Sequence, residues 1–377
     1  MTSVATVDAL AAESRSAPMP VERLRHLAAA EDQDNGRITA SVDALRAAGW
    51  LIRCLPLSLG GESLGAGGAV ARASVRALSH IAEYSLPLAR LLEGHVNALG
   101  LVCRWGTADL QSRVADQVRN GLLLGVWGAD METPVSLDAA TNRLTGKKRY
   151  ASGLGDVGQA VITARTDAGV QLCLVDVSDQ ERADVSPWQM NGMRASASGH
   201  YDFSNLAGDS VEPFGKPNVY QIEPWFHGGV WRIAAVQIGG VFGALELARD
   251  ELRQLGRLDN DAQVARLAPI LFRARAAREL ITTVASHVDE MRTPADPDTL
   301  MAESISTRLL TEEIGLDAIS AVQRSIGLPL FESNSHVGRQ CRDLATYLRQ
   351  AAPDGLLQLA GRVALLGNES LSGRDYP

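Results

Sequence analysis

Apolar residues recur at helical spacing in the first third of the chain. The stretches VERLRHLAAA, SVDALRAAGW and GAVARASVRALSHIAEY carry apolar residues at positions i, i+3 and i+4, which is the period of one helix face. A glycine-rich stretch, PLSLGGESLG, interrupts them. In TADLQSRVADQVRNG, Thr107 is a candidate N-cap, and Gly121 is a candidate for the residue just past the helix end. The pattern predicts an N-terminal helical domain over residues 1–122.

The period changes between residues 123 and 222. KKRYASG, QAVITAR, VQLCLVDV and HYDFSNL are short and rich in β-branched and aromatic residues, and turn-forming residues separate them. We expect a small antiparallel β domain here. The stretch GLGDVG (Gly153, Gly155 and Gly158) fits the glycine spacing of a dinucleotide fingerprint, but QAVITAR follows it like a strand where the fingerprint needs a helix. We therefore interpret GLGDVG as a hairpin loop.

Long helical runs return after residue 223. The candidates are 226–255, 261–291, 297–326 and 335–351, with a last helix after Pro353. Short breaks such as RTPADPD, which holds Pro294 and Pro297, favour an antiparallel bundle over residues 223–377. Several glycines lie early in the first run, where a helix disfavours them, and they indicate close approach of another backbone or of a flat ligand: Gly228, Gly229, Gly239, Gly240 and Gly243.

Composition narrows the class of protein. The chain has 377 residues, 46% hydrophobic and 21% charged, which is typical of a globular protein of two or three domains. A formal net charge of −8 argues against nucleic acid as the main partner. The four cysteines are widely spaced and form no C-x-x-C pair, and no H-E-x-x-H motif occurs, so no metal site is predicted.

Targeting signals are also missing from the sequence pattern. The first twenty residues lack a basic segment followed by an apolar core. The most apolar long stretch, VWRIAAVQIGGVFGALELA, contains Arg232, Gln237 and Glu246, and we interpret it as a core helix and not as a membrane span. We expect a soluble, cytoplasmic protein.

Several stretches, in the same order, resemble the acyl-CoA dehydrogenase superfamily. AAGWLIRCLPLSLGGESLG and EGHVNALGLVCRWGTADLQSRVADQVRNG are similar to its first domain, LTGKKRYASG and GMRASASGHYDFSNLAGDSVEP to its middle domain, and GRQCRDL to the R-x-x-R-D of its last. The resemblance implies a multi-domain α+β fold with an N-terminal helical domain, a middle β-barrel domain and a C-terminal four-helix bundle. It also implies FAD between the β domain and the bundle, and a homodimer or homotetramer.

The resemblance assigns four candidate cofactor-binding residues. Tyr150 matches a tryptophan that packs on the flavin, and Ser152 matches a threonine that hydrogen-bonds the flavin near its reactive nitrogen. Trp127, in the stretch VWGAD, falls in the family's first flavin-contacting strand. Arg257 falls near an arginine that reaches the FAD phosphate of a neighbouring subunit, although the accompanying Phe-Gly is absent here.

The family's catalytic carboxylate is missing at its aligned position. In the family, a glutamate removes the α-proton of an acyl-CoA thioester while hydride passes to the flavin. That position holds Ala351 here, and the second family location holds Trp231 beside Arg232. Asp354 is the nearest carboxylate, so it becomes the candidate catalytic base.

Three functions are compatible with this resemblance. The first is an FAD-dependent oxidoreductase that acts on the CH–CH group of an acyl-CoA, with a relocated base and an electron-transfer or reductase partner. The second is a flavin-dependent monooxygenase of the same fold, in which reduced flavin from a partner reductase activates oxygen and a histidine, His95 or His336, lies near the flavin. The third is a non-catalytic homologue that binds flavin or an acyl group.

Overall fold

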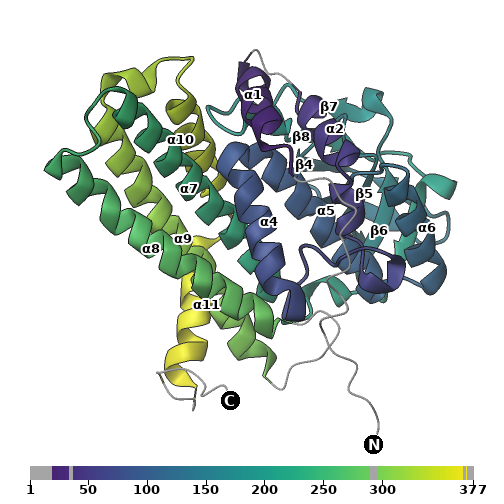
Figure 1. Cartoon of the computed structure of the whole chain (residues 1–377). Coiled ribbons are helices and arrows are strands. Elements are labelled where there is room, and N and C mark those ends of the chain that lie inside the picture. Colours follow the sequence, from purple (N-terminus) through teal and green to yellow (C-terminus); the bar gives the residue numbers. More distant parts are fainter. Residues whose placement is uncertain (1–18, 34–36, 289–295, 368–370, 372–377) are drawn as a thin grey trace, which may run out of the picture.

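A computed structural model of the chain describes residues 19–33, 37–288, 296–367 and 371. Figure 1 shows helices in the first part of the chain, strands in the middle and long helices at the end. The multi-domain α+β fold that the sequence implies is therefore confirmed. The boundaries after residues 122 and 222 stay predictions. The N-terminal stretch without a signal pattern lies almost wholly outside the described residues, as does Pro294.

Two of the N-terminal helices begin at a side-chain N-cap. The side chain of Ser85 accepts a hydrogen bond from the Leu88 amide (3.3 Å). That of Thr107 accepts one from the Leu110 amide (3.2 Å), so the predicted N-cap at Thr107 is confirmed. Gly121 follows the last helix with a left-handed φ of 93°. The helices are α1 (Val21–Asp32), α2 (Thr39–Ala47), α3 (Trp50–Arg53), α4 (Ala71–Tyr84), α5 (Leu86–Trp105) and α6 (Ala108–Arg119).

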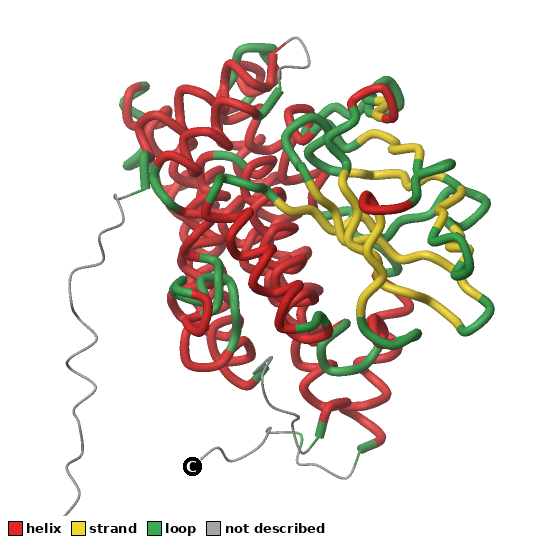
Figure 2. The backbone as a smooth tube through the Cα atoms, turned by 90° about the vertical axis from the view of Figure 1, so that its right-hand side faces the viewer, coloured by secondary structure: helices red, strands yellow, loops and turns green. Residues whose placement is uncertain are grey.

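Nine described strands form two sheets on one side of the helices (Figure 2). The six-stranded sheet has the order β3-β2-β5-β6-β9, with β1 also pairing with β5, and the three-stranded sheet has the order β4-β8-β7. The strands are β1 (Leu124–Trp127), β2 (Ser136–Asp138), β3 (Arg143–Thr145), β4 (Lys147–Ala151), β5 (Gln159–Thr166), β6 (Gly169–Asp176), β7 (Ala183–Asp184), β8 (Gly199–Asp202) and β9 (Val211–Phe214).

Two sequence interpretations of this region are wrong in detail. The sheet is mixed and not purely antiparallel, because β1 and β2 both pair with β5 in parallel. The loop that holds GLGDVG joins β4 to β5, which lie in different sheets, so it is not a hairpin. Gly153 and Gly155 in this loop have left-handed φ values of 80° and 92°, which explains the need for glycine there.

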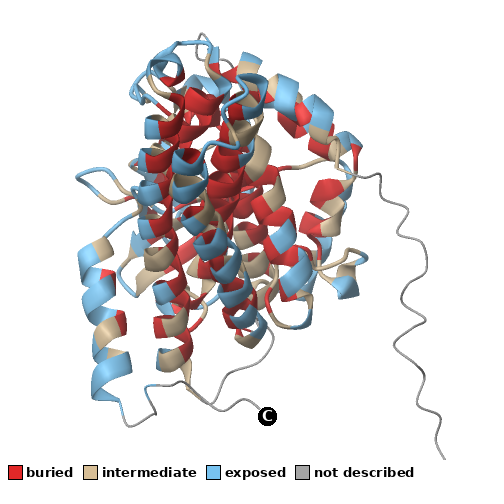
Figure 3. Ribbon diagram, turned by 60° about the vertical axis from the view of Figure 1, so that its left-hand side comes forward, coloured by how far each residue is buried: buried red, intermediate tan, exposed pale blue. Residues whose placement is uncertain are grey.

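The C-terminal helices follow the predicted runs closely. They are α7 (Trp231–Gln254), α8 (Asp261–His287), α9 (Pro297–Ile326), α10 (His336–Tyr347) and α11 (Pro353–Leu366). The helices bury one face and expose the other (Figure 3). Helix α11 packs on α9 and projects from the rest of the molecule (Figure 1).

Helix α7 is the core helix of this part. Within the described ranges, His227–Gln254 is the one helix whose length and composition would allow it to cross a membrane, and 78% of its most apolar stretch is buried inside the protein. Its glycines allow α4 to approach: a Cβ at Gly239 would lie 2.2 Å from the Ser79 carbonyl oxygen, and one at Gly243 would lie 2.4 Å from that of Glu83. The predicted close approach of another backbone is confirmed at these two positions.

Candidate functional site

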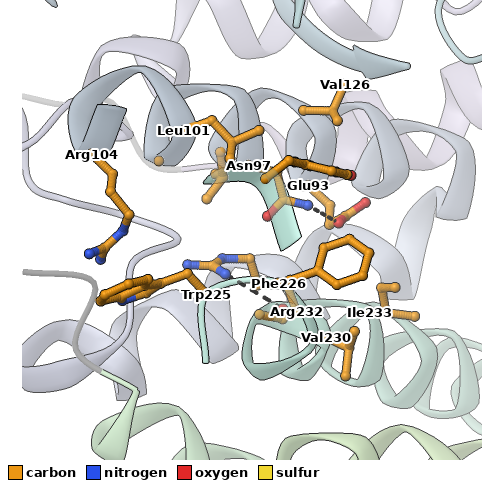
Figure 4. A pocket seen from close by; sticks show the side chains of 14 residues that line it. Glu93, Asn97, Leu101, Arg104, Val126, Trp225, Phe226, Val230, Arg232 and Ile233 are labelled. Carbon is orange, nitrogen blue, oxygen red and sulfur yellow. Dashed lines mark hydrogen bonds between the residues drawn. The ribbon is translucent and has the colours of Figure 1, made fainter. Parts of the chain in front are cut away.

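A pocket of about 230 Å³ lies between α5 and the segment that leads into α7 (Figure 4). One wall comes from α5, the opposite wall from the start of α7 and the loop before it, and the end of β1 contributes Val126. The pocket therefore lies where the N-terminal helices, the strands and the C-terminal helices meet. The lining residues are Glu93, Val96, Asn97, Gly100, Leu101, Arg104, Val126, Tyr220, Trp225, Phe226, Gly229, Val230, Arg232 and Ile233.

His95 attaches β1 to α5. Its ring is fully buried, and its Nδ1 accepts a hydrogen bond from the Leu124 amide at the start of β1 (3.1 Å). The other ring nitrogen lies 3.4 Å from the Leu51 carbonyl oxygen, to which it donates in this tautomer. Burial lowers the pKa of His95 to about 4, so the ring is neutral near pH 7. His95 is therefore a structural residue, and the other candidate histidine, His336, is exposed at the first position of α10.

Glu93 places a buried carboxylate in the pocket wall. Its side chain is almost inaccessible to solvent, and it accepts hydrogen bonds from Arg90 and from the Asn97 amide. These partners lie three and four residues away, so all three side chains share one face of α5. A buried carboxylate without such partners would be costly, and the pairing with Arg90 offsets part of that cost. Burial alone would lower the pKa of Arg90, but the Glu93 charge raises it overall.

The sequence analysis did not identify this group of residues. The signal that could have found it is the spacing R-x-x-E-x-x-x-N in LARLLEGHVN, where three polar residues interrupt an otherwise apolar helix. Such spacing places polar side chains together on a buried face, and a buried polar face needs a structural or functional reason.

Arg308 and Tyr347 are buried hydrogen-bond donors with unused capacity. Arg308 donates through Nη1 to the Ala351 carbonyl oxygen (3.1 Å), while its Nε and Nη2 find no hydrogen-bond partner in the described part of the chain. The Tyr347 hydroxyl also lacks one there. Burial, and next the Glu93 carboxylate, raises the pKa of Tyr347 well above its ordinary value. Orphaned buried donors of this kind indicate that a ligand or water completes the site.

The structure brings two predicted cofactor-binding residues together. Trp127 is buried at the end of β1, and its indole Nε1 donates to the Ser152 carbonyl oxygen (3.0 Å). The Ser152 hydroxyl accepts from Ser198 (2.8 Å). Tyr150 lies two residues before Ser152 and has a left-handed φ of 54°. It is 49% exposed, so part of its ring faces the outside. Trp127 and Ser152 thus share one position between β1 and β4.

The other predicted residues lie elsewhere. Arg257 is exposed beyond the far end of α7, whose 24 residues span about 36 Å, so it cannot reach the pocket of its own chain. Asp354 is exposed in the first turn of α11, and Ala351 is exposed just before that helix. None of the three lines the pocket, whereas Glu93 does.

Asp343 holds the loop before β8 against α10. Its carboxylate accepts a hydrogen bond from the Met193 amide (2.6 Å) and pairs with Arg339 one turn earlier (3.1 Å). Arg342, the adjacent residue, pairs instead with Asp32 (2.8 Å). Asp343 therefore pairs with Arg339 and not with the adjacent Arg342. Burial raises the pKa of Asp343 from 3.8 to about 6.

Comparison with known proteins finds several that resemble this chain in sequence or in fold. No family model matches the chain. Dibenzothiophene monooxygenase of Rhodococcus erythropolis is 26% identical over 346 residues, which cover 81% of this chain and 82% of that protein. The crystal structure of dibenzothiophene monooxygenase from Paenibacillus sp. A11-2 matches with a TM-score of 0.80 at 19% identity, over 94% of this chain and 97% of that one. A related structure of the Paenibacillus protein contains FMN and indole.

A structure of butyryl-CoA dehydrogenase from Megasphaera elsdenii matches with a TM-score of 0.77 at 15% identity, over 91% of this chain and 94% of that one. The chain therefore has the fold that these two proteins share. The relatives and structures support the flavin-dependent monooxygenase alternative better than the acyl-CoA dehydrogenation that we expected first.

The raised pKa of Asp343 predicts a pH-dependent stability term. Because the folded-state pKa (about 6) lies above the ordinary value of 3.8, the folded state binds this proton more readily. The contribution is therefore fully present below pH 3.8 and is lost as pH rises through 6. Asp343→Asn keeps an acceptor for the Met193 amide and removes the titration. In urea unfolding from pH 4 to 7, we expect the variant to gain stability relative to the wild type as pH rises, and a constant difference would contradict this.

Proposed function

We propose that this protein is a flavin-dependent monooxygenase that acts on a small aromatic molecule bound in the pocket between α5 and the start of α7. The observation that carries the proposal is the state of the carboxylate in this pocket. Glu93 is held by Arg90 and Asn97, so both of its oxygens are engaged. Removal of an α-proton from a thioester needs a positioned carboxylate that is available to the substrate, whereas monooxygenation does not.

The position of the family base supports the same choice. Ala351 has no acidic group, and its carbonyl oxygen is occupied by Arg308. Asp354 lies on the surface in α11. The relatives that match over 81% of this chain are dibenzothiophene monooxygenases. A dehydrogenase that used Asp354 would need the chain to move at Pro353.

The residues present fit a flavin. Tyr150 offers an exposed ring, and Ser152 offers a hydroxyl just after β4. The Nε and Nη2 of Arg308 and the Tyr347 hydroxyl are buried donors without hydrogen-bond partners in the described chain. These donors would bind the carbonyl oxygens and ring nitrogens of an isoalloxazine. When bound in its reduced form, a flavin supplies the electrons that activate dioxygen. FAD and FMN share this ring, so both are candidates for the cofactor.

To such a reaction, this chain itself would contribute a pocket with aromatic walls. Trp225 and Phe226 provide flat aromatic surfaces, and Arg104 stabilises the first by stacking on it at 4.0 Å from the ring centroid. The volume of about 230 Å³ exceeds the cavity of roughly 150 Å³ that holds benzene in a well-studied case. One or two fused rings therefore fit.

The proposal includes a partner reductase. The glycine-rich stretch GLGDVG leads into β5 and not into a helix, so it is not a nicotinamide-nucleotide site. Reduced flavin would then come from a separate protein. We expect flavin supplied in the reduced form to be sufficient for turnover without any electron-transfer site on this chain.

Oxygen incorporation tests the proposal directly. The protein is given FMN or FAD, a reductase with NADH, and indole as the probe substrate under ¹⁸O₂. We expect one labelled oxygen atom in the product by mass spectrometry. Anaerobic mixing of the flavin-loaded protein with butyryl-CoA should leave the flavin oxidised, and rapid bleaching there would show that the protein is a dehydrogenase.

Flavin affinity tests the assigned donors. Arg308→Met should weaken flavin binding by roughly 10–100-fold, since a hydrogen bond from a charged donor contributes about 1.5–3 kcal/mol. Tyr347→Phe should weaken it by a few-fold only, as expected for a neutral hydrogen bond. Arg349→Met is the matched control, because Arg349 is an exposed arginine that pairs with Glu312. Fluorescence titration with FMN and FAD measures all four proteins; unchanged affinity in both Arg308→Met and Tyr347→Phe would remove these residues from the flavin site.

Assembly is proposed through the C-terminal helices. Helix α11 contacts mainly α9 and leaves large apolar side chains exposed: Leu357, Leu365 and Leu366. Burying such side chains against a second copy would remove them from water. We expect a homodimer or homotetramer, and sedimentation equilibrium that gives a pure monomer at micromolar concentration would contradict this.

A further inference from the structure

We propose that the amide oxygen of Asn97 selects aromatic substrates that carry an N–H or O–H donor. This inference rests on the proposed function, because it names the class of substrate that the same pocket accepts. It concerns one hydrogen bond, from a ring substituent or ring nitrogen of the substrate to Oδ1 of Asn97.

The orientation of the Asn97 amide is fixed by its neighbour. Carboxylate oxygens accept hydrogen bonds, and those of Glu93 are paired with Arg90 and with the Asn97 side chain. The amide nitrogen of Asn97 must therefore face Glu93, to which it donates. The opposite orientation would bring two acceptor oxygens together. Figure 4 shows the resulting arrangement, with the amide oxygen turned away from Glu93.

No group in the described part of the chain donates a hydrogen bond to Oδ1 of Asn97. The residue is half-buried and lines the pocket. An apolar ligand that fills the pocket would remove water from this oxygen and leave it unpaired. A ligand with a donor would replace the lost water, and sites with a buried polar group discriminate strongly on this basis.

The surrounding wall offers few other acceptors: the two oxygens of Glu93, which Arg90 and Asn97 engage, and the Tyr220 hydroxyl. Val96, Leu101, Val230 and Ile233 are apolar lining residues. Arg232 is a donor, and it uses its Nε on the Gly65 carbonyl oxygen (2.7 Å). Discrimination between two ligands of equal shape should therefore depend mainly on Asn97.

Indole and benzothiophene provide a matched pair of probes. They have nearly the same shape, and the ring N–H of indole is replaced by sulfur in benzothiophene. For the flavin-loaded wild type, we expect indole to bind ~2–12-fold more tightly, which is the effect of one neutral hydrogen bond. Asn97→Leu, a substitution of similar size, should bring the ratio of the two dissociation constants to about 1.

Two controls separate selection from general damage. Leu101→Val changes an apolar part of the same wall, and it should weaken both ligands alike and preserve the ratio. On the wild type, 1-methylindole should bind less tightly than indole, because methylation removes the donor; this measurement needs no variant to fold. All affinities are measured by isothermal titration calorimetry.

The outcomes distinguish this inference from the proposed function. Equal affinity for indole and benzothiophene in the wild type overturns the inference, as does a preference that survives Asn97→Leu, or a failure of both ligands to bind. Oxygen-dependent turnover without a preference for indole over benzothiophene overturns the role of Asn97 and leaves the monooxygenase proposal standing. A preference that depends on Asn97, without any oxygen incorporation, overturns the monooxygenase proposal alone.

Discussion

A carboxylate buried in the middle of α5 sets the geometry of the pocket. Arg90 and Asn97 lie on the same helix face as Glu93 and donate to it, which offsets the cost of burying a carboxylate there. The two partners are thereby fixed in orientation, and the wall of α5 acquires a defined polar pattern. The end of β1 lies close by: a Cβ at Gly94 would approach the Val126 amide nitrogen to 3.9 Å. One paired charge therefore determines both the chemistry of this wall and the position from which a substrate is recognised.

The fold does not decide the reaction. Butyryl-CoA dehydrogenase and dibenzothiophene monooxygenase match this chain with similar TM-scores, 0.77 and 0.80. The same scaffold therefore carries both kinds of chemistry, and the difference must come from a few side chains. In this chain the aligned base position is Ala351, and the carboxylate that lines the pocket, Glu93, is fully paired. His95 has both ring nitrogens engaged and fixes β1 to α5.

The sequence predicted the helices better than the sheets or the pocket. Helix α9 begins and ends where its pattern indicates, because proline, glycine and a long apolar stripe are all local signals. The parallel pairing of β1 with β5 depends on segments far apart in the chain, which no local pattern records. Trp127 and Ser152 were assigned as cofactor-binding residues through the family resemblance, and that role stays a prediction. Glu93 and Asn97 were missed because their role depends on which face of α5 turns toward α7.

A crystal structure of the protein with FMN and indole would test the central claim most directly. We expect density for indole between α5 and the rings of Trp225 and Phe226, with the indole nitrogen at hydrogen-bond distance from Oδ1 of Asn97. We also expect the flavin to contact Ser152 and to lie against the pocket. Indole bound at another place, or in this pocket with its nitrogen turned away from Asn97, would contradict the account.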